Sequence, residues 1–226
     1  MSTILHVPFY LDTEQLAEKL RIKPQSGLIE EFTELMDRVQ KAAQPKVLYK
    51  TSYIENRTED EITIDGITFT STAMQMNLKG INRVFAYVAT CGTEVDNLYI
   101  DPKDFVKITW LHYIKLELLK PSVPFLNKHL TTSFGLTKLS SMSPGSADAS
   151  IWPIQQQADL FRLIGDVKTL IGVRLTESYL MAPDVSISGI LFSANVTYQN
   201  CQLCQRENCP SRSAPFNSTL WENIHK

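Results

Sequence analysis

The sequence predicts an α+β protein in which helices flank a mixed or antiparallel β-sheet. Three observations support this fold class. Predicted strands and helices are intermixed without a regular βαβ repeat. Residues 83–90 form a β-rich and nearly continuous apolar run, which is typical of a central strand. Asp65 and Gly66 supply the positive φ angles that a two-residue hairpin turn needs.

The first half of the chain contains elements whose ends are marked by capping residues and prolines. We expect helices at 12–20, 27–43 and 72–78, a strand at 47–53, a hairpin at 62–69 and the central strand at 83–90. Asp12 or Thr13 can accept the free N–H groups at the start of the first helix. Ser26 is the expected N-cap of the second helix, which Pro45 ends.

A long helix dominates the second half of the chain. It is expected to begin after Asp101-Pro102, because proline is favoured in a first helical turn, and to be broken by Pro121 and Pro124. Its apolar residues cover more than one side, which predicts burial on more than one face. After it we expect a short helix at 125–130, a strand at 134–142, a loop to 153, a helix at 153–164 and two strands around a turn at Pro183-Asp184.

The overall composition argues against two kinds of partner. The chain has a net charge of −2 and neither a basic stripe nor an arginine-rich arm, which disfavours nucleic acid. No apolar run is long enough to span a membrane, and the N-terminus lacks the features of a secretory signal. The expected compartment is therefore the cytoplasm, where clustered cysteines are more often metal ligands or redox groups than disulfides.

Several segments together match one family pattern. They are SPG at 143–145, a helix ending in ADLFRLIG at 158–165, LTES at 175–178 and S-x-S-G at 186–189, preceded by VATCGTEVD at 88–96. They resemble the activation domain of vitamin B12-dependent methionine synthase, most strongly over residues 141–193. The resemblance implies a C-shaped domain with a long curved antiparallel sheet and flanking helices. It also implies binding of S-adenosylmethionine and remethylation of cobalamin that has slipped to cob(II)alamin, with an electron from a flavodoxin-type donor.

The ligand-binding loop of this family reads Arg, three residues, Gly, Tyr. Aligned on Pro144 and Gly145, the Arg position is Ser141 and the Tyr position is Ser146. A carboxylate normally pairs with a bidentate guanidinium, worth roughly 1.5–3 kcal/mol as a charge-assisted bond, and serine cannot replace it. The candidate cofactor-binding residues implied by the resemblance are therefore Ser141, Met142, Pro144, Gly145 and Ser146, with an expected loss of S-adenosylmethionine affinity.

The LTES segment has two interpretations. Thr176, Glu177 and Ser178 could hydrogen-bond locally in a strand and turn, or Glu177 could take a direct part in catalysis. We favour the local, structural interpretation and predict no catalytic residue.

The last part of the chain contains three clustered cysteines. Cys201, Cys204 and Cys209 have the spacing C-x2-C-x4-C, and Pro210 follows directly. Such spacing lets thiolates face a common point, as zinc sites and iron–sulfur clusters require, and the Cys-Pro pair favours iron–sulfur. The only other cysteine, Cys91 at the end of the central strand, is the candidate fourth ligand. Zinc, thiol redox chemistry, and plain cysteines with Cys91 as a small buried hydrophobe all remain alternatives.

These observations combine into one predicted function. We expect a stand-alone relative of the activation domain, with an α+β body at 1–200 and a Cys-rich tail at 201–226 packed on it. It would dock a corrinoid protein or cobalamin-dependent methyltransferase, and its iron–sulfur centre would relay an electron from a flavodoxin- or ferredoxin-type donor to the cobalt. The alternatives are a non-catalytic docking module with a structural zinc, and an S-adenosylmethionine-binding activator with an altered clamp. Cobalamin would be reached only through the partner, and no independent catalysis is expected.

Overall fold

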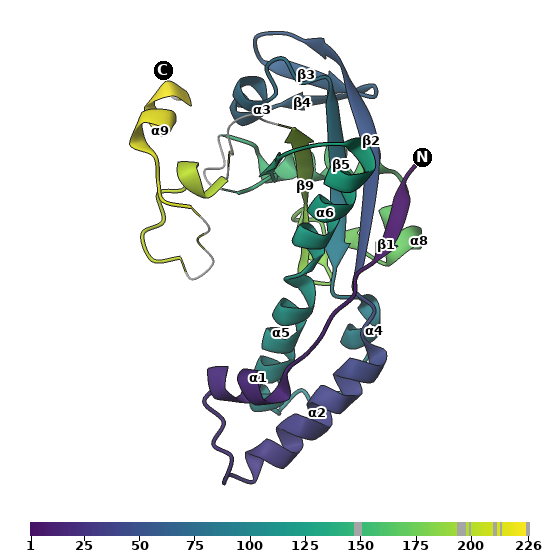
Figure 1. The fold of residues 1–226 in the computed structure, drawn as a ribbon, viewed down its shortest axis with the longest axis vertical. Coiled ribbons are helices and arrows are strands. Elements are labelled where there is room, and N and C mark those ends of the chain that lie inside the picture. Colours follow the sequence, from purple (N-terminus) through teal and green to yellow (C-terminus); the bar gives the residue numbers. More distant parts are fainter. Residues whose placement is uncertain (147–150, 194–197, 199, 210–211, 213, 225–226) are drawn as a thin grey trace.

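A curved β-sheet at one end and a helical arm at the other make up the molecule (Figure 1). The structure is a computed structural model that describes all residues except 147–150, 194–197, 199, 210–211, 213 and 225–226. The predicted α+β class and the curved antiparallel sheet with flanking helices are confirmed, because every strand pair within the described residues is antiparallel. No helix in the described part of the chain is both long and apolar enough to cross a membrane.

The main sheet has the strand order β4-β3-β2-β5-β9-β6, and β1 pairs with the first part of β2. Its strands are β1 (Thr3–His6), β2 (Lys46–Arg57), β3 (Glu61–Ile64), β4 (Ile67–Thr70), β5 (Arg83–Thr90), β6 (Leu139–Met142) and β9 (Ser186–Ser193). The predicted central strand is confirmed as β5, which lies between β2 and β9. The hairpin turn at Asp65-Gly66 is also confirmed, with φ of 44° and 75°.

Helices cover both faces of β5, and its alternating side chains reach two separate cores. Val84, Ala86 and Val88 belong to one core, which also receives side chains from α3 (Thr72–Asn77), α7 (Gln157–Ile164) and α8 (Val167–Ile171). Phe85 and Tyr87 belong to the other, which receives Leu126 and Leu130 from α6 (Ser122–Phe134). Burial on both faces explains why the strand reads as a continuous apolar run.

The helical arm lies below the sheet in Figure 1 and contains a third hydrophobic core. Its helices are α1 (Thr13–Lys19), α2 (Leu28–Ala42), α4 (Thr93–Asp96) and α5 (Phe105–Leu119). The rings of Phe32 on α2 and Trp110 on α5 meet edge to face at 5.3 Å. Asp12 caps α1, as predicted, by accepting a hydrogen bond from the backbone N–H of Gln15 at 2.9 Å.

Three predicted helix boundaries are wrong. Ser26 does not cap α2, because its hydroxyl donates to the carbonyl of Lys23. Proline 102 does not open α5, which begins at Phe105 with Asp104 as its cap. Pro121 and Pro124 do not reduce the next helix to six residues, because they lie at and just inside the start of the 13-residue α6. The first turn of a helix does not need their missing N–H groups.

The C-terminal segment contains the two predicted strands around Pro183-Asp184, which are β8 (Met181–Ala182) and β9. They do not pair with each other, because β8 pairs with β7 (Arg174–Leu175) in a separate ribbon, whereas β9 joins the main sheet. The sequence interpretation missed β1, α4 and α8, as well as the 3-10 helix η2 (Asn200–Leu203) and the helix α9 (Ser218–Ile224). The remaining element is the 3-10 helix η1 (Ile154–Gln156).

Candidate functional site

The loop after β6 requires a glycine at position 145. Gly145 has φ of +69°, and a Cβ there would lie 2.7 Å from the Cδ1 atom of Ile154. Its N–H donates to the carbonyl of Trp152 at 2.8 Å, which ties the loop to the start of η1. Pro144 is buried beside it. The backbone of the predicted ligand loop is therefore set by the positive φ of Gly145 and by its hydrogen bond to Trp152.

A cavity of about 340 Å³ opens beside this loop. It lies between the end of α5, the start of α6 and the strands β5, β6 and β9, and its lining residues are Tyr87, Leu116, Leu119, Lys120, Val123, Ser141, Ser143 and Ile187. Of the predicted loop residues, Ser141 reaches the cavity. Met142 instead points into the core on the other face of the sheet. Pro144, Gly145 and Ser146 are not among the lining residues.

Tyr87 forms the buried polar wall of the cavity, although only 1% of its surface is exposed. Burial raises the pKa of the Tyr87 phenol to about 12, and its hydrogen bond with Ser143 only partly offsets this effect. The phenol is therefore neutral at physiological pH and can both donate and accept a hydrogen bond. The sequence analysis did not identify Tyr87 as a candidate site residue, because in the sequence it is one more residue in the apolar run of a central strand.

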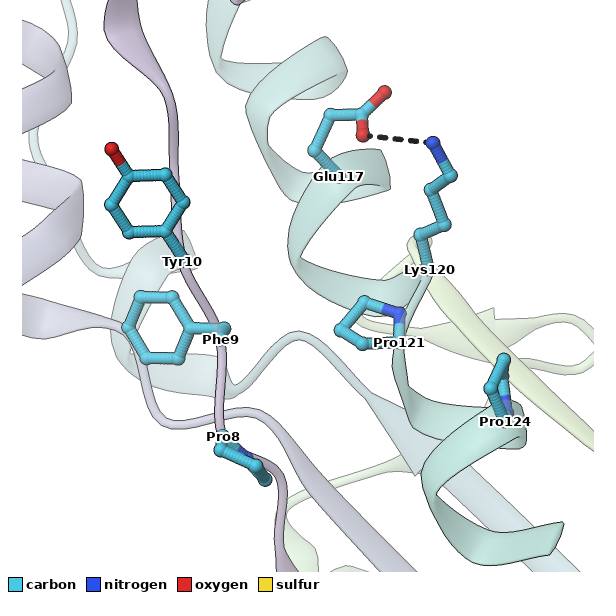
Figure 2. A pocket seen from close by; sticks show the side chains of 7 residues that line it. All are labelled: Pro8, Phe9, Tyr10, Glu117, Lys120, Pro121 and Pro124. Atoms are coloured by element: carbon cyan, nitrogen blue, oxygen red, sulfur yellow. Dashed lines mark hydrogen bonds and ion pairs between the residues drawn. The ribbon is translucent and has the colours of Figure 1, made fainter. Parts of the chain in front are cut away.

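A second cavity, of about 590 Å³, lies where the N-terminal segment crosses the corner between α5 and α6. Figure 2 shows Phe9 and Tyr10 on the N-terminal segment. Glu117 on α5 and Lys120, directly after the end of α5, lie across from them. Lys120 lines both cavities, so they are neighbours. Nothing in the sequence pattern around this lysine pointed to a cavity, because it reads as a solvated residue between a helix and a proline.

The outer side of α5 is exposed and apolar. The buried side of the helix consists of Trp110, Ile114 and Leu118, at four-residue intervals. The exposed side carries large apolar side chains, with Phe105 75% and Leu116 42% exposed, and its other members are Val106, Ile108 and Tyr113. The prediction that this helix is buried on more than one face is therefore wrong for the protein alone. Because Leu116 also lines the 340 Å³ cavity, the exposed face leads into that cavity.

The comparisons with known proteins agree with this geometry. Residues 131–213 match the family model described as the activation domain of vitamin B12 dependent methionine synthase. The crystal structure of the MetH reactivation domain bound to AdoHcy matches with a TM-score of 0.57 and 16% sequence identity, over 88% of this chain and 80% of that chain. The resemblance to the activation domain is confirmed. A comparison with the curated proteins gives no match.

The LTES segment closes a turn of this activation-domain fold. The hydroxyl of Thr176 accepts from the N–H of Leu180 at 3.1 Å, and its backbone N–H donates to the Leu180 carbonyl at 2.8 Å. Gln157 donates from Nε2 to the carbonyl of Tyr179 at 2.8 Å and so fixes the turn to α7. These contacts support the structural interpretation for Thr176, and Glu177 lies exposed in the same turn.

The Cys-rich tail begins beside the Gly145 loop. The N–H of Tyr198 donates to the Ser140 hydroxyl at 2.9 Å, and Asn200 donates from Nδ2 to the carbonyl of Ser143 at 3.4 Å. Leu203 is fully buried in the core that contains α7 and α8. The tail therefore leaves the body next to Ser143, a residue that lines the 340 Å³ cavity.

The guanidinium of Arg212 holds the cysteine loop together through backbone carbonyls. It donates to the carbonyls of Cys201 and Cys204, each at 3.3 Å, and to those of Arg206 and Ala214. Cys201, Cys204 and Cys209 are all partly exposed and form no disulfide. Within the described residues, no three His, Cys, Asp or Glu side chains gather in an arrangement that could hold a metal ion. Pro210, the residue that favours iron–sulfur in the sequence, lies outside the described residues.

Cys91 lies away from the tail. The tail follows β9, whose last paired residues lie beside Val84 at the start of β5, whereas Cys91 follows the other end of that strand. Seven residues of strand separate the two places, or about 23 Å at ~3.3 Å per residue. Cys91 is fully buried in the core of the helical arm, and burial raises the pKa of its thiol to about 12. The structure therefore does not bring Cys91 to the other three cysteines.

Proposed function

We propose that this protein is an accessory factor for reductive reactivation of a corrinoid methyltransferase. It would dock on the cobalamin-carrying partner while a flavodoxin- or ferredoxin-type donor supplies the electron. One observation carries the proposal: on an activation-domain fold, the exposed apolar face of α5 leads directly into the cavity beside the Gly145 loop. The partner binds the corrinoid, and this chain contributes a surface and a cavity.

The apolar face of α5 supports the docking part of this proposal. A soluble protein rarely leaves several large apolar side chains exposed along one helix unless another surface covers them. Phe105, Tyr113 and Leu116 have no such cover within the described part of the chain. Docking would bury them and would bring the partner to the mouth of the cavity.

The proposal is tested by a reactivation assay. A cobalamin-dependent methyltransferase in the cob(II)alamin state is mixed with a methyl donor and a reduced flavodoxin, with and without this protein. We expect the protein to increase the rate at which the cob(II)alamin absorbance disappears and methyl transfer returns. Equal rates with and without the protein, over a set of corrinoid partners, would overturn the proposal.

The cavity also supports the alternative of an S-adenosylmethionine-binding activator with an altered clamp. AdoHcy is bound by the MetH reactivation domain, and here the loop keeps its glycine-dependent backbone while Ser141 and Ser146 stand at the Arg and Tyr positions. The residues that could hold such a ligand are Ser141, Ser143 and Tyr87. S-adenosylmethionine, when bound, would supply the methyl group and leave as AdoHcy, and these residues would orient it.

The tail carries a separate proposal, that Cys201, Cys204 and Cys209 bind an iron–sulfur cluster, with zinc as the alternative. Their spacing and the carbonyl contacts of Arg212 support it. The thiols are not gathered in the described residues, so binding requires the loop to close around the metal.

Metal and sulfide analysis after anaerobic purification tests the tail proposal. Iron and sulfide that are lost in Cys204→Ala but retained in Cys91→Ala would support a tail-bound cluster. Zinc without sulfide would instead favour a non-catalytic docking module with a structural zinc. A sample with neither metal would overturn both forms of the proposal.

A further inference from the structure

We infer that Lys120 binds the carboxylate of a ligand whose body occupies the 340 Å³ cavity, which makes Lys120 the residue that selects ligands with a carboxylate. This inference rests on the proposed function only in taking the cavity to be a ligand site. It deepens that proposal because it names the residue that reads the charge of the ligand.

The lining of the cavity defines a ligand with two different ends. One wall is aliphatic and consists of Leu116, Leu119, Val123 and Ile187. The polar groups are the hydroxyls of Tyr87, Ser141 and Ser143, which recognise neutral donors and acceptors. Lys120 is the only charged residue among the described residues that line it. A neutral, partly apolar body with a single negative group therefore matches this cavity.

The ion pairs around Lys120 leave its charge available. The carboxylate of Glu117 is bonded to Lys19 through Oε1, and its Oε2 atom lies 3.4 Å from the Nζ atom of Lys120. Two ammonium groups thus share one carboxylate, and the trio keeps a net positive charge. The side chain of Lys120 is 74% exposed, so it can turn from Glu117 to a ligand without losing a buried partner. Figure 2 shows the Glu117–Lys120 pair at the rim of the second cavity.

The test compares two ligands that differ in one end. S-adenosylhomocysteine carries an amino-acid group with one carboxylate and one ammonium. By contrast, 5′-methylthioadenosine keeps the nucleoside and the thioether sulfur but lacks that group. Each is titrated calorimetrically into wild-type protein, Lys120→Gln and the control Lys128→Gln, which removes an exposed lysine further along α6. Thermal melts of the variants check that each remains folded.

We expect the wild-type protein to bind S-adenosylhomocysteine about tenfold more tightly than 5′-methylthioadenosine, as one charge-assisted contact predicts. Lys120→Gln should abolish this preference and leave the affinity for 5′-methylthioadenosine unchanged, whereas Lys128→Gln should behave as wild type. A preference that survives in Lys120→Gln would overturn the inference, and so would the absence of binding by either ligand.

The reactivation assay separates this inference from the proposed function. Loss of the ligand preference in Lys120→Gln together with no effect of the protein on cob(II)alamin would leave the inference standing and remove the proposed function. Reactivation by a protein that binds neither ligand would do the reverse.

Discussion

The helices α2 and α5 have the same length and lie in the same arm, but they present different surfaces. Each has 15 residues, and each contributes an aromatic ring to the shared core through Phe32 and Trp110. Outside that core, α2 is mainly charged and polar, whereas α5 exposes Phe105, Tyr113 and Leu116. A structural helix needs one apolar stripe, so the second apolar stripe of α5 indicates an interface.

The largest expected effect on stability concerns the buried stripe of α5 that packs against α2. Trp110→Ala should lower the free energy of unfolding by about 3–5 kcal/mol, because it removes a buried ring and leaves a cavity beside Phe32. Urea denaturation measures this loss. The matched control is Phe105→Ala on the exposed side of the same helix, which should change stability by less than about 0.5 kcal/mol. Equal losses in both variants would mean that the exposed stripe is structural and that the two helices do not differ in role.

The next effect concerns the exposed stripe. The double variant Phe105→Asp/Tyr113→Asp should weaken binding to a corrinoid partner at least tenfold, about 1.4 kcal/mol, because it places two charges in an apolar contact. Binding is measured by calorimetry or biolayer interferometry, with thermal melts to confirm folding.

Leu28→Asp is the matched control for this variant, since Leu28 is an exposed apolar residue at the start of α2. It should leave partner binding unchanged. A similar loss from both variants would assign the effect to added charge rather than to the α5 face.

The sequence could predict the features that local signals determine. The Asp65-Gly66 turn, the Asp12 cap and the apolar run of β5 each follow from a few adjacent residues. The strand β1 could not be found in this way, because Thr3–His6 forms a strand only by pairing with Lys46–Tyr49, forty or more residues away. Pro124 can lie within α6 only because the helix begins just before it, and the sequence did not predict that starting point.

The candidate site was predictable only in part, for a related reason. Ser141 was found because the family pattern marks its position, and it does line the cavity. Tyr87 and Lys120 come from distant elements that the tertiary fold brings to the same place, and neither belongs to a local motif. The exposure of one side of α5 was missed because a second apolar stripe looks the same whether the chain itself or a partner covers it.

The smallest expected effect concerns the one acidic residue near the end of α5. Burial raises the pKa of Glu117, but the hydrogen bond and charge of Lys19, together with Lys120, outweigh burial and hold the pKa below its ordinary value. A lowered pKa in the folded state stabilises the protein above the unfolded pKa of about 4.3, and that contribution disappears as the pH falls through the folded value. Glu117→Gln should therefore flatten the pH dependence of stability below about pH 5, with a loss at neutral pH of at most about 1 kcal/mol for this partly exposed pair.

Urea denaturation of both proteins from neutral to acidic pH measures the difference. If the free energies of unfolding of the two proteins changed in parallel with pH, Glu117 would have an ordinary pKa in the folded protein. The ion pair between Glu117 and Lys120 would then contribute little, and a ligand carboxylate could replace it at almost no cost.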